Sequence, residues 1–211
     1  MANTDTPFGL RPIRHRNGAA YNGATNPYYI NSTYATALFI GDPVIKVAGG
    51  SNAAFVSAPG VGEFDIGMLP EIEKATAGDG NRITGVIVGF APLADDLTKQ
   101  YNPASTERVA LVCDDPDVIF QIQSDGALAA SSMGLNAVLI YTNGGSTVSG
   151  LSGVELDSGT ATAPSADASN QLLILRTANI PGNDVTAAWC KVEVLINQHT
   201  QNQGTVGTLG I

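Results

Sequence analysis

Short apolar stretches separated by turn-forming residues are the feature that most constrains how this chain can fold. From residue 34 onward, segments rich in valine, isoleucine, leucine and phenylalanine alternate with clusters of glycine, asparagine, aspartate and proline. In segment 118–123 (VIFQIQ), Val118, Phe120 and Ile122 share one face, because side chains alternate faces along a strand. A series of such segments predicts a mainly β fold, a β-sandwich or barrel of jelly-roll-like or β-tulip-like form, with a few short helices.

The expected elements are short and closely spaced. Helical patterns are weak, because none shows several turns of amphipathic period. Segment 144–170 is rich in serine, glycine, threonine and alanine, and predicts a long loop that holds one short strand within 151–157. We expect strands within 36–47, 81–90, 107–113, 118–123, 136–141, 171–177 and 190–197, and helical turns within 70–76, 93–100 and 126–135.

The first 33 residues have the pattern of an extended arm, ahead of a β-rich body at 34–200 and a C-terminal tail at 201–211. Prolines and glycines oppose a helix in residues 1–33, yet aromatic and basic residues recur there. Tyrosine offers a large contact face with a polar tip, which suits docking on another protein. The arm either docks on a neighbour or folds back across its own domain. The candidate partner-binding residues are Phe8, Arg11, Arg14, Arg16, Tyr21, Tyr28 and Tyr29.

Charge is scarce and unevenly distributed. Only 14% of the residues are charged, whereas about 25% is typical of soluble domains. Because small neutral side chains are easier to desolvate than lysine or glutamate, this composition favours a chain that hides surface against neighbours. The net charge of −9 argues against nucleic-acid binding, since phosphates would be repelled. Residues 1–30 are the exception, because they hold three arginines and a single acid, Asp5.

Segment 113–126 (CDDPDVIFQIQSDG) concentrates carboxylates around one proline. Pro116 disfavours helical backbone at Asp115, and aspartate caps turns by accepting backbone N–H bonds, so CDDPD predicts a bend between two strands. Two other interpretations remain open: a calcium site, since carboxylates are suitable hard ligands, or a catalytic acid pair. The EF-hand spacing is not matched, and sugar-stacking aromatics are scarce. Substituting Asp114, Asp115 and Asp117 by asparagine would distinguish the two roles. A structural turn should lose stability or assembly, whereas an enzyme would fold and lose turnover.

The remaining reactive side chains predict no catalytic, metal or cofactor site. Cys113 and Cys190 lie in or beside apolar segments and are expected to be buried thiols, although a disulfide is open if their strands are neighbours. The two histidines, His15 and His199, lie near the ends of the sequence, and no nucleophile elbow or phosphate loop is present. The sequence shows no signal peptide and no membrane span, so we expect synthesis in a cytoplasm.

Several segments together resemble a family of tailed-bacteriophage head-associated structural proteins, usually described as decoration or cement proteins. The resemblance covers most of the chain. It is carried by MANTDTPFGLRPIRHRNG and NPYYI near the start, ATALFIGDPV (36–44 with the preceding alanine), TGVIVGF (84–90), DDPDVIFQIQSDG (114–126), GLNAVLI (134–140), GLSGVELD (150–157) and VEVLINQH (192–199).

The resemblance implies a virion protein without enzymatic activity that binds the major capsid protein, bridges its subunits and stabilises the head. It also implies a position on the capsid surface and self-association as a homotrimer. Contacts repeated over a capsid lattice add up by multivalency. Two other functions stay open: a host-surface or glycan-binding module that uses loop 144–170, and a hydrolase that uses the clustered aspartates.

Overall fold

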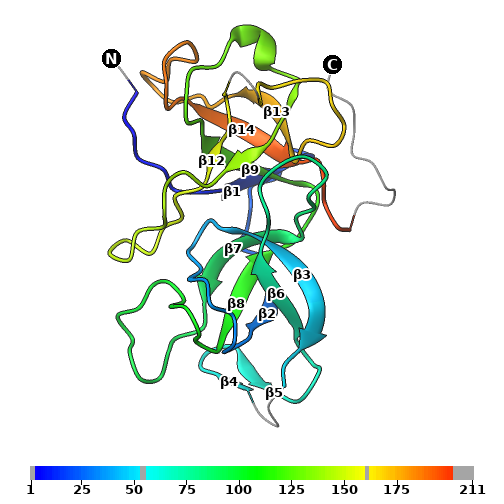
Figure 1. Ribbon diagram of the computed structural model, residues 1–211, viewed down its shortest axis with the longest axis vertical. Helices are drawn as coiled ribbons and strands as arrows, with labels where there is room; N and C mark the ends of the chain where they lie inside the picture. Colours follow the sequence, from blue (N-terminus) through cyan, green and yellow to red (C-terminus); the bar gives the residue numbers. More distant parts are fainter. Residues whose placement is uncertain (1–2, 53–55, 160–161, 202–211) are drawn as a thin grey trace.

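The structure, a computed structural model, describes residues 3–52, 56–159 and 162–201, and it is mainly β (Figure 1). The chain forms two stacked β lobes, which confirms the expected fold class. The lower lobe is a closed barrel in the order β2 (Asn26–Ile30), β6 (Pro70–Lys74), β3 (Pro43–Gly50), β7 (Gly85–Phe90) and β8 (Arg108–Cys113). The upper lobe is a sheet in the order β1 (Arg11–His15), β9 (Val118–Gln123), β14 (Lys191–Ile196), β13 (Leu172–Thr177) and β10 (Asn136–Ala137).

Smaller elements complete the two lobes. The hairpin of β4 (Val56–Ala58) and β5 (Gly62–Phe64) lies at the far end of the barrel, as Figure 1 shows. In the upper lobe, β11 (Leu139–Ile140) pairs with β12 (Glu155–Leu156), which is the short strand expected inside the long loop. The one 3-10 turn in the described part of the chain, η1 (Ala130–Ser132), lies within the helical segment expected at 126–135.

The barrel is an insertion within the upper lobe. Strand β1 belongs to the upper sheet, the chain then builds the whole barrel from β2 to β8, and it returns to the upper sheet at β9. There β9 pairs antiparallel with β1, with Arg11 opposite Gln121. The prediction of one body at 34–200 behind a separate arm is therefore wrong in its boundaries. The tail predicted at 201–211 lies outside the described residues except for Gln201.

Three expected elements took another form. Segment 70–76 forms strand β6 instead of a helix, because Ile72 is fully buried inside the barrel while its chain neighbours Glu71 and Glu73 are half-buried. Segment 93–100 contains turns and no helix. The first half of 36–47 contributes only isolated bridges, at Leu38 and Ile40, before β3 begins.

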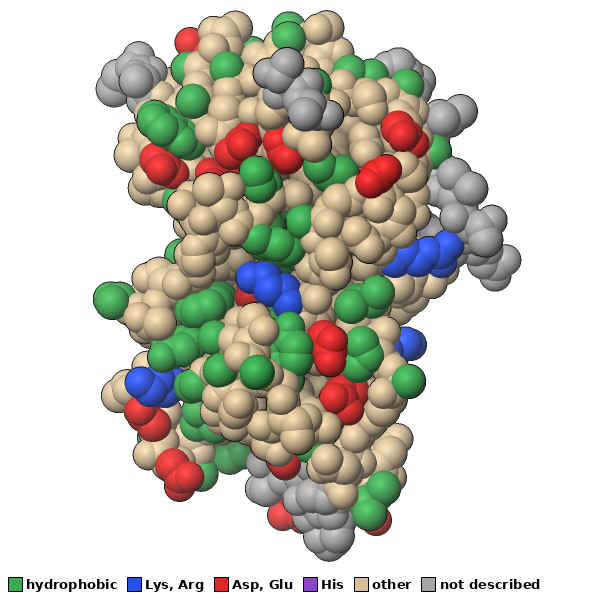
Figure 2. All heavy atoms as spheres, in the orientation of Figure 1, with side chains coloured by type: hydrophobic (Ala, Val, Ile, Leu, Met, Phe, Trp, Pro, Cys, Tyr) green, Lys and Arg blue, Asp and Glu red, His purple; other side chains and the backbone are tan. Residues whose placement is uncertain are grey.

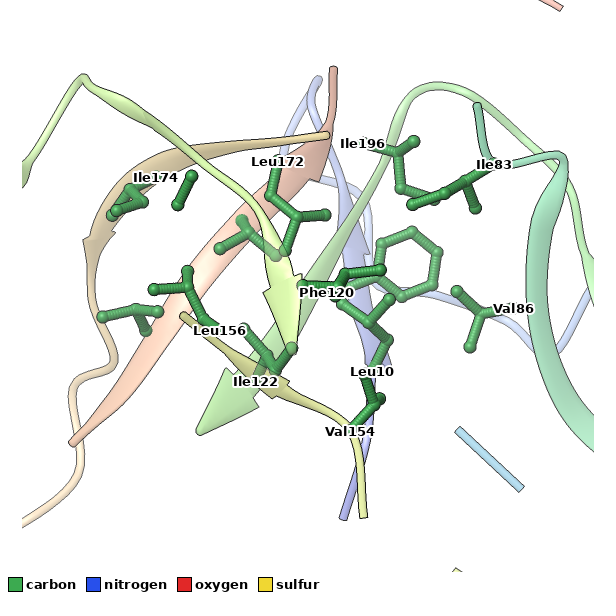
Figure 3. Packing of buried hydrophobic residues seen from close by; sticks show 14 of the residues in the cluster. Leu10, Ile83, Val86, Phe120, Ile122, Val154, Leu156, Leu172, Ile174 and Ile196 are labelled. Carbon is green, nitrogen blue, oxygen red and sulfur yellow. The ribbon is translucent and has the colours of Figure 1, made fainter. Parts of the chain in front are cut away.

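One cluster of buried apolar side chains contains residues of both lobes and joins them. Figure 3 shows Phe120 of β9 facing Ile83 and Val86 of the barrel, with Leu10 beside it. Val86 faces the upper lobe, whereas the next residue of β7, Ile87, belongs to the cluster inside the barrel. The alternation of side chains along β7 thus lets one strand supply both cores.

Buried polar contacts reinforce this junction. Asp42 is fully buried, and its carboxylate accepts the Ser152 hydroxyl at 2.6 Å and the Phe39 backbone N–H at 2.8 Å. Lys74 Nζ lies 2.9 Å from the same carboxylate. Ser152 comes from the upper lobe and the other three residues from the barrel lobe. A buried carboxylate satisfied by an ion pair and two hydrogen bonds fixes the lobes against each other.

The N-terminal segment, predicted to be an extended arm, is largely part of this fold. Tyr28 is buried inside the barrel at 4% exposure, and Tyr29 is fully buried on the outer face of β2. Tyr29 packs there with Ala58 and Phe64 of the β4–β5 hairpin. The alternative, in which the segment folds back across its own domain, therefore describes residues 8–15 and 26–30. On the two faces of β2, the aromatic rings of Tyr28 and Tyr29 are shielded from water, whereas in an arm extended into solvent they would remain exposed.

The close approach of Gly9 to Gly41 gives a stability prediction. Gly9 has a φ of +72°, and a Cβ atom there would lie 2.5 Å from the Gly41 carbonyl oxygen and 2.7 Å from Ser152 Cβ. We expect Gly9→Ala to lower the free energy of unfolding by about 2–4 kcal/mol, through left-handed strain plus overpacking, as measured by urea denaturation. Gly18→Ala is the control, because Gly18 has a similar φ of +88° and nothing within 4 Å. Equal losses in the two variants would contradict the steric account.

Candidate functional site

The aspartate turn lies where the chain passes between the lobes. It follows β8 of the barrel and precedes β9 of the upper sheet, and the Val118 N–H donates to the Asp115 carbonyl at 3.2 Å. Asp115 Oδ1 also accepts the Asp117 N–H at 2.8 Å. The interpretation of CDDPD as a bend between strands is therefore confirmed. The bend is also the second of two connections between the lobes.

The same turn binds the first connection, residues 16–25, and the residues that flank it. Asp114 accepts the Tyr28 hydroxyl at 2.8 Å and the Asn26 side-chain amide at 2.8 Å. His15 Nδ1 lies 3.3 Å from Asp115 Oδ2, and Arg16 lies 3.2 Å from Asp117. Burial, together with the hydrogen bond to Asp114, raises the pKa of Tyr28. The three carboxylates thus hold the two crossing segments together.

The remaining chemistry near this turn is buried. Cys113 and Cys190 are free and fully buried, which confirms the expectation of two thiols. Burial raises the pKa of Cys113 to about 11, so the thiolate that acts as a nucleophile is disfavoured. His199 is buried beside the turn, and desolvation lowers its pKa against the opposing effect of Asp114 and Asp115. In the described part of the chain, no three His, Cys, Asp or Glu side chains are placed to hold a metal ion.

The outer face of the upper sheet carries a clamped glutamate. Glu193 is 6% exposed, and its carboxylate lies 2.6 Å from Arg14 and 2.8 Å from Arg176. Burial alone would raise the pKa of Glu193, but the hydrogen bonds and charges of the two arginines lower it below its ordinary value. Arg14, predicted to bind a partner, is therefore engaged within its own chain.

Two β-bulges aim both arginines at this carboxylate. The register of β1 against β9 shifts between Pro12 and Arg14, and that of β13 against β14 shifts between Ile174 and Arg176. An extra residue in one strand moves the side chains that follow it to the opposite face of the sheet. Each bulge therefore places its arginine side chain on the outer face. Without the bulges, strict alternation would direct both arginines to the core side of the sheet.

A groove of about 560 Å³ lies beside the clamp. Its lining includes the cations Arg11 and Lys191 and the apolar residues Leu151 and Ile180, the latter 41% exposed. Arg11 stacks over the ring of Phe8 at 4.5 Å. None of the described residues that line the groove is acidic, and no ion pair in the described segments involves Arg11 or Lys191. The groove is therefore cationic on a chain with a net charge of −9.

The structure separates the predicted partner-binding residues. It brings Phe8 and Arg11 together at the groove and uses Arg14 in the clamp. Arg16 is exposed and pairs with Asp117, and half-buried Tyr21 packs against the core and donates to the Ala24 carbonyl at 2.8 Å. Tyr28 and Tyr29 are buried, so the prediction that they contact a partner is wrong. Sequence reasoning missed the groove residues Gln121, Leu151, Ile180 and Lys191, which come from distant segments.

Exposed apolar side chains mark three further surfaces. Leu97 is 77% exposed and Val148 is 92% exposed, each at the tip of a loop, and these loops project on the same side of Figure 1. Ile66 and Met68, both 65% exposed, lie after the hairpin at the end of the barrel. Trp189 lies in the turn before β14, at 37% exposure and with a φ of +62°.

The face of the molecule that Figure 2 shows carries few charged side chains. Figure 2 shows hydrophobic side chains gathered over one side of the barrel lobe, with acidic side chains scattered over both lobes. No helix in the described part of the chain has the length and apolar character needed to cross a membrane. Comparisons with protein-family models, with curated proteins and with solved structures gave no match to this chain.

The turn between the lobes predicts a stability effect for Asp114. We expect Asp114→Asn to lower the free energy of unfolding by about 1–3 kcal/mol, because a buried charged acceptor for Tyr28 and Asn26 is lost. In a Tyr28→Phe background the same substitution should cost less, as measured by a denaturation double-mutant cycle. The control is Asp117→Asn at an exposed ion pair, with an expected loss below about 1 kcal/mol. Strict additivity in the cycle would rule out the coupling.

The clamp on Glu193 predicts a pH dependence. Since its folded pKa lies below the unfolded value, Glu193 stabilises the fold above about pH 4–5, and this stabilisation is lost as the pH falls through the folded pKa. Glu193→Gln should lower the free energy of unfolding by about 1–2 kcal/mol at about pH 7, and the difference from wild type should shrink at about pH 3. Glu63→Gln, which removes an exposed carboxylate, is the control. A difference that stays constant across this pH range would exclude the clamp as its source.

Proposed function

We propose that this chain is a decoration (cement) protein of a tailed-bacteriophage head, which binds the major capsid protein and bridges its subunits without enzymatic activity. In this proposal it is made in the host cytoplasm and ends on the capsid surface as a homotrimer. The sequence resemblance supports the proposal over most of the chain, including segments of both lobes. The low content of charged residues, 14%, favours burial of surface against neighbours.

The observation that carries the proposal is the pair of projecting loops tipped by Leu97 and Val148. Each places an aliphatic side chain almost fully in water, at 77% and 92% exposure. Burying apolar surface is favourable by about 25 cal/mol per Å², so both side chains would gain from contact with a shell protein. Two such tips on one side of the molecule form a natural docking face (Figure 1).

Contacts at the base of the two loops hold them in place, which lowers the conformational entropy that they would lose on docking. Tyr101, in the loop of Leu97, stacks on Phe39 with a ring-centroid distance of 5.2 Å. The Ile40 N–H donates to the carbonyl of Gly150 at 2.9 Å, at the base of the Val148 loop. Segment 38–41 therefore supports both loops at once. A preorganised surface binds more tightly than one that must be ordered on contact.

Co-sedimentation of the purified protein with undecorated phage heads tests this proposal. We expect wild type to bind in many copies per head, and Leu97→Asp combined with Val148→Asp to weaken binding at least about tenfold, because charges would be desolvated at the contact. The control is Ala19→Asp combined with Ala24→Asp, which adds the same charge at exposed positions between β1 and β2. Absence of wild-type binding would refute the function, and unchanged binding of the Leu97 and Val148 variant would refute this docking face.

A further inference from the structure

We infer that the cationic groove of the upper lobe is a self-association site, and that its occupant is the turn at 63–68 of a second copy of this chain. This inference deepens the proposed function, on which it rests, by assigning the surfaces through which copies would contact each other. The groove combines the cations Arg11 and Lys191 with the apolar residues Leu151 and Ile180. Its occupant must therefore offer carboxylates next to apolar side chains.

The turn at 63–68 has this composition. Glu63 and Asp65 are acids at its start, and Ile66 and Met68 are each 65% exposed. None of the ion pairs in the described segments involves Glu63 or Asp65, and the Asp65 carboxylate accepts only a local hydrogen bond there, from the Ile66 N–H at 2.7 Å, so no cation in these segments neutralises either charge. The two surfaces are thus complementary in charge and both partly apolar. Such complementarity favours the correct register of association.

The turn is held in place before any contact forms. The buried Ser51 hydroxyl donates to the Asp65 carbonyl at 2.6 Å, and the Gly67 N–H donates to the Ser51 carbonyl at 2.8 Å. The Met68 N–H closes the turn by donating to the Asp65 carbonyl at 3.1 Å. Ile66 and Met68 are therefore presented outward from a fixed backbone, which reduces the entropy lost on binding.

The geometry requires two copies. The turn follows the β4–β5 hairpin at the far end of the barrel lobe (Figure 1), whereas the groove is lined by Arg11, Gln121 and Lys191 of the upper sheet. One molecule cannot fill its own groove with this turn while the core and the Asp42 contacts hold the lobes together. Contact between two different surfaces is heterologous, and it produces a ring when the rotation closes. A closed ring of three copies is the form that agrees with a homotrimer.

Sedimentation velocity of the full chain over a range of concentrations, without phage heads, tests the inference. Wild type is expected to associate reversibly above the monomer, and to do so less at high salt, because the contact includes exposed charges. The groove variant Arg11→Glu with Lys191→Glu, and the turn variant Glu63→Lys with Asp65→Lys, should each weaken association at least about tenfold. A chain that carries all four substitutions should regain association, because the charges are again opposite.

Matched controls exclude a general effect of charge. Lys46→Glu and Asp95→Lys alter exposed charges outside the two surfaces and should leave association unchanged. Circular dichroism and thermal unfolding identify any variant that fails to fold, and Ile66→Ser then provides a neutral test of the turn. A wild type that stays monomeric overturns the inference, as does association that survives both charge reversals.

Head binding separates this inference from the function it rests on. A monomeric wild type that still binds heads leaves the proposed function standing and removes the self-association site. If the groove variant loses head binding while wild type shows no association, the groove binds a capsid segment and the inference is wrong. Failure of wild type to bind heads refutes the function whatever the sedimentation result.

Discussion

The structure depends on one constraint: the chain leaves the upper sheet after β1, builds a complete barrel, and must return to pair β9 with β1. Two connections therefore cross between the lobes at one place. Asp114 joins them through Tyr28 and Asn26, partners 86 and 88 residues away in sequence. Asp115 lies 3.3 Å from His15, and Asp117 forms an ion pair with Arg16. Carboxylates suit this position because each one accepts several hydrogen bonds in a short turn. Their concentration around Pro116 is explained by this structural role.

The junction makes the two lobes one body, and this determines which surfaces remain for function. Apolar side chains of the barrel, such as Ile83 and Val86, complete the core of the upper sheet, and Asp42 is satisfied from both lobes. Tyr28 and Tyr29 also stabilise the fold, because they are buried on the two faces of β2. The exposed surfaces left for the proposed contacts with partners are therefore the loop tips, the groove and the end of the barrel. The loop tips present exposed apolar side chains, whereas the groove and the end of the barrel combine apolar side chains with charged ones.

Parts of this arrangement were accessible from sequence pattern, and parts were not. Alternation predicted the core face of β9, because burial on one face imposes a period of two. The helix predicted at 70–76 was wrong because the barrel buries Ile72 on a strand, and local propensity does not include that contact. The clamp at Glu193 was not predictable, since it needs two bulges that reverse the facing of Arg14 and Arg176. The groove was missed for a similar reason, because Arg11, Leu151 and Lys191 meet only after the sheet has formed.

The sequence by itself determined the β class, most strand positions, the bend at CDDPD and the two buried thiols. Each of these follows from interactions between residues close in the chain: side-chain alternation, turn chemistry and local hydrophobicity. Only the tertiary structure decided that the barrel is inserted into the upper lobe, that Tyr28 and Tyr29 are buried, and that a cationic groove lies beside the Glu193 clamp. These features depend on pairing between strands far apart in sequence, and the free energy of such contacts is not encoded in any single segment.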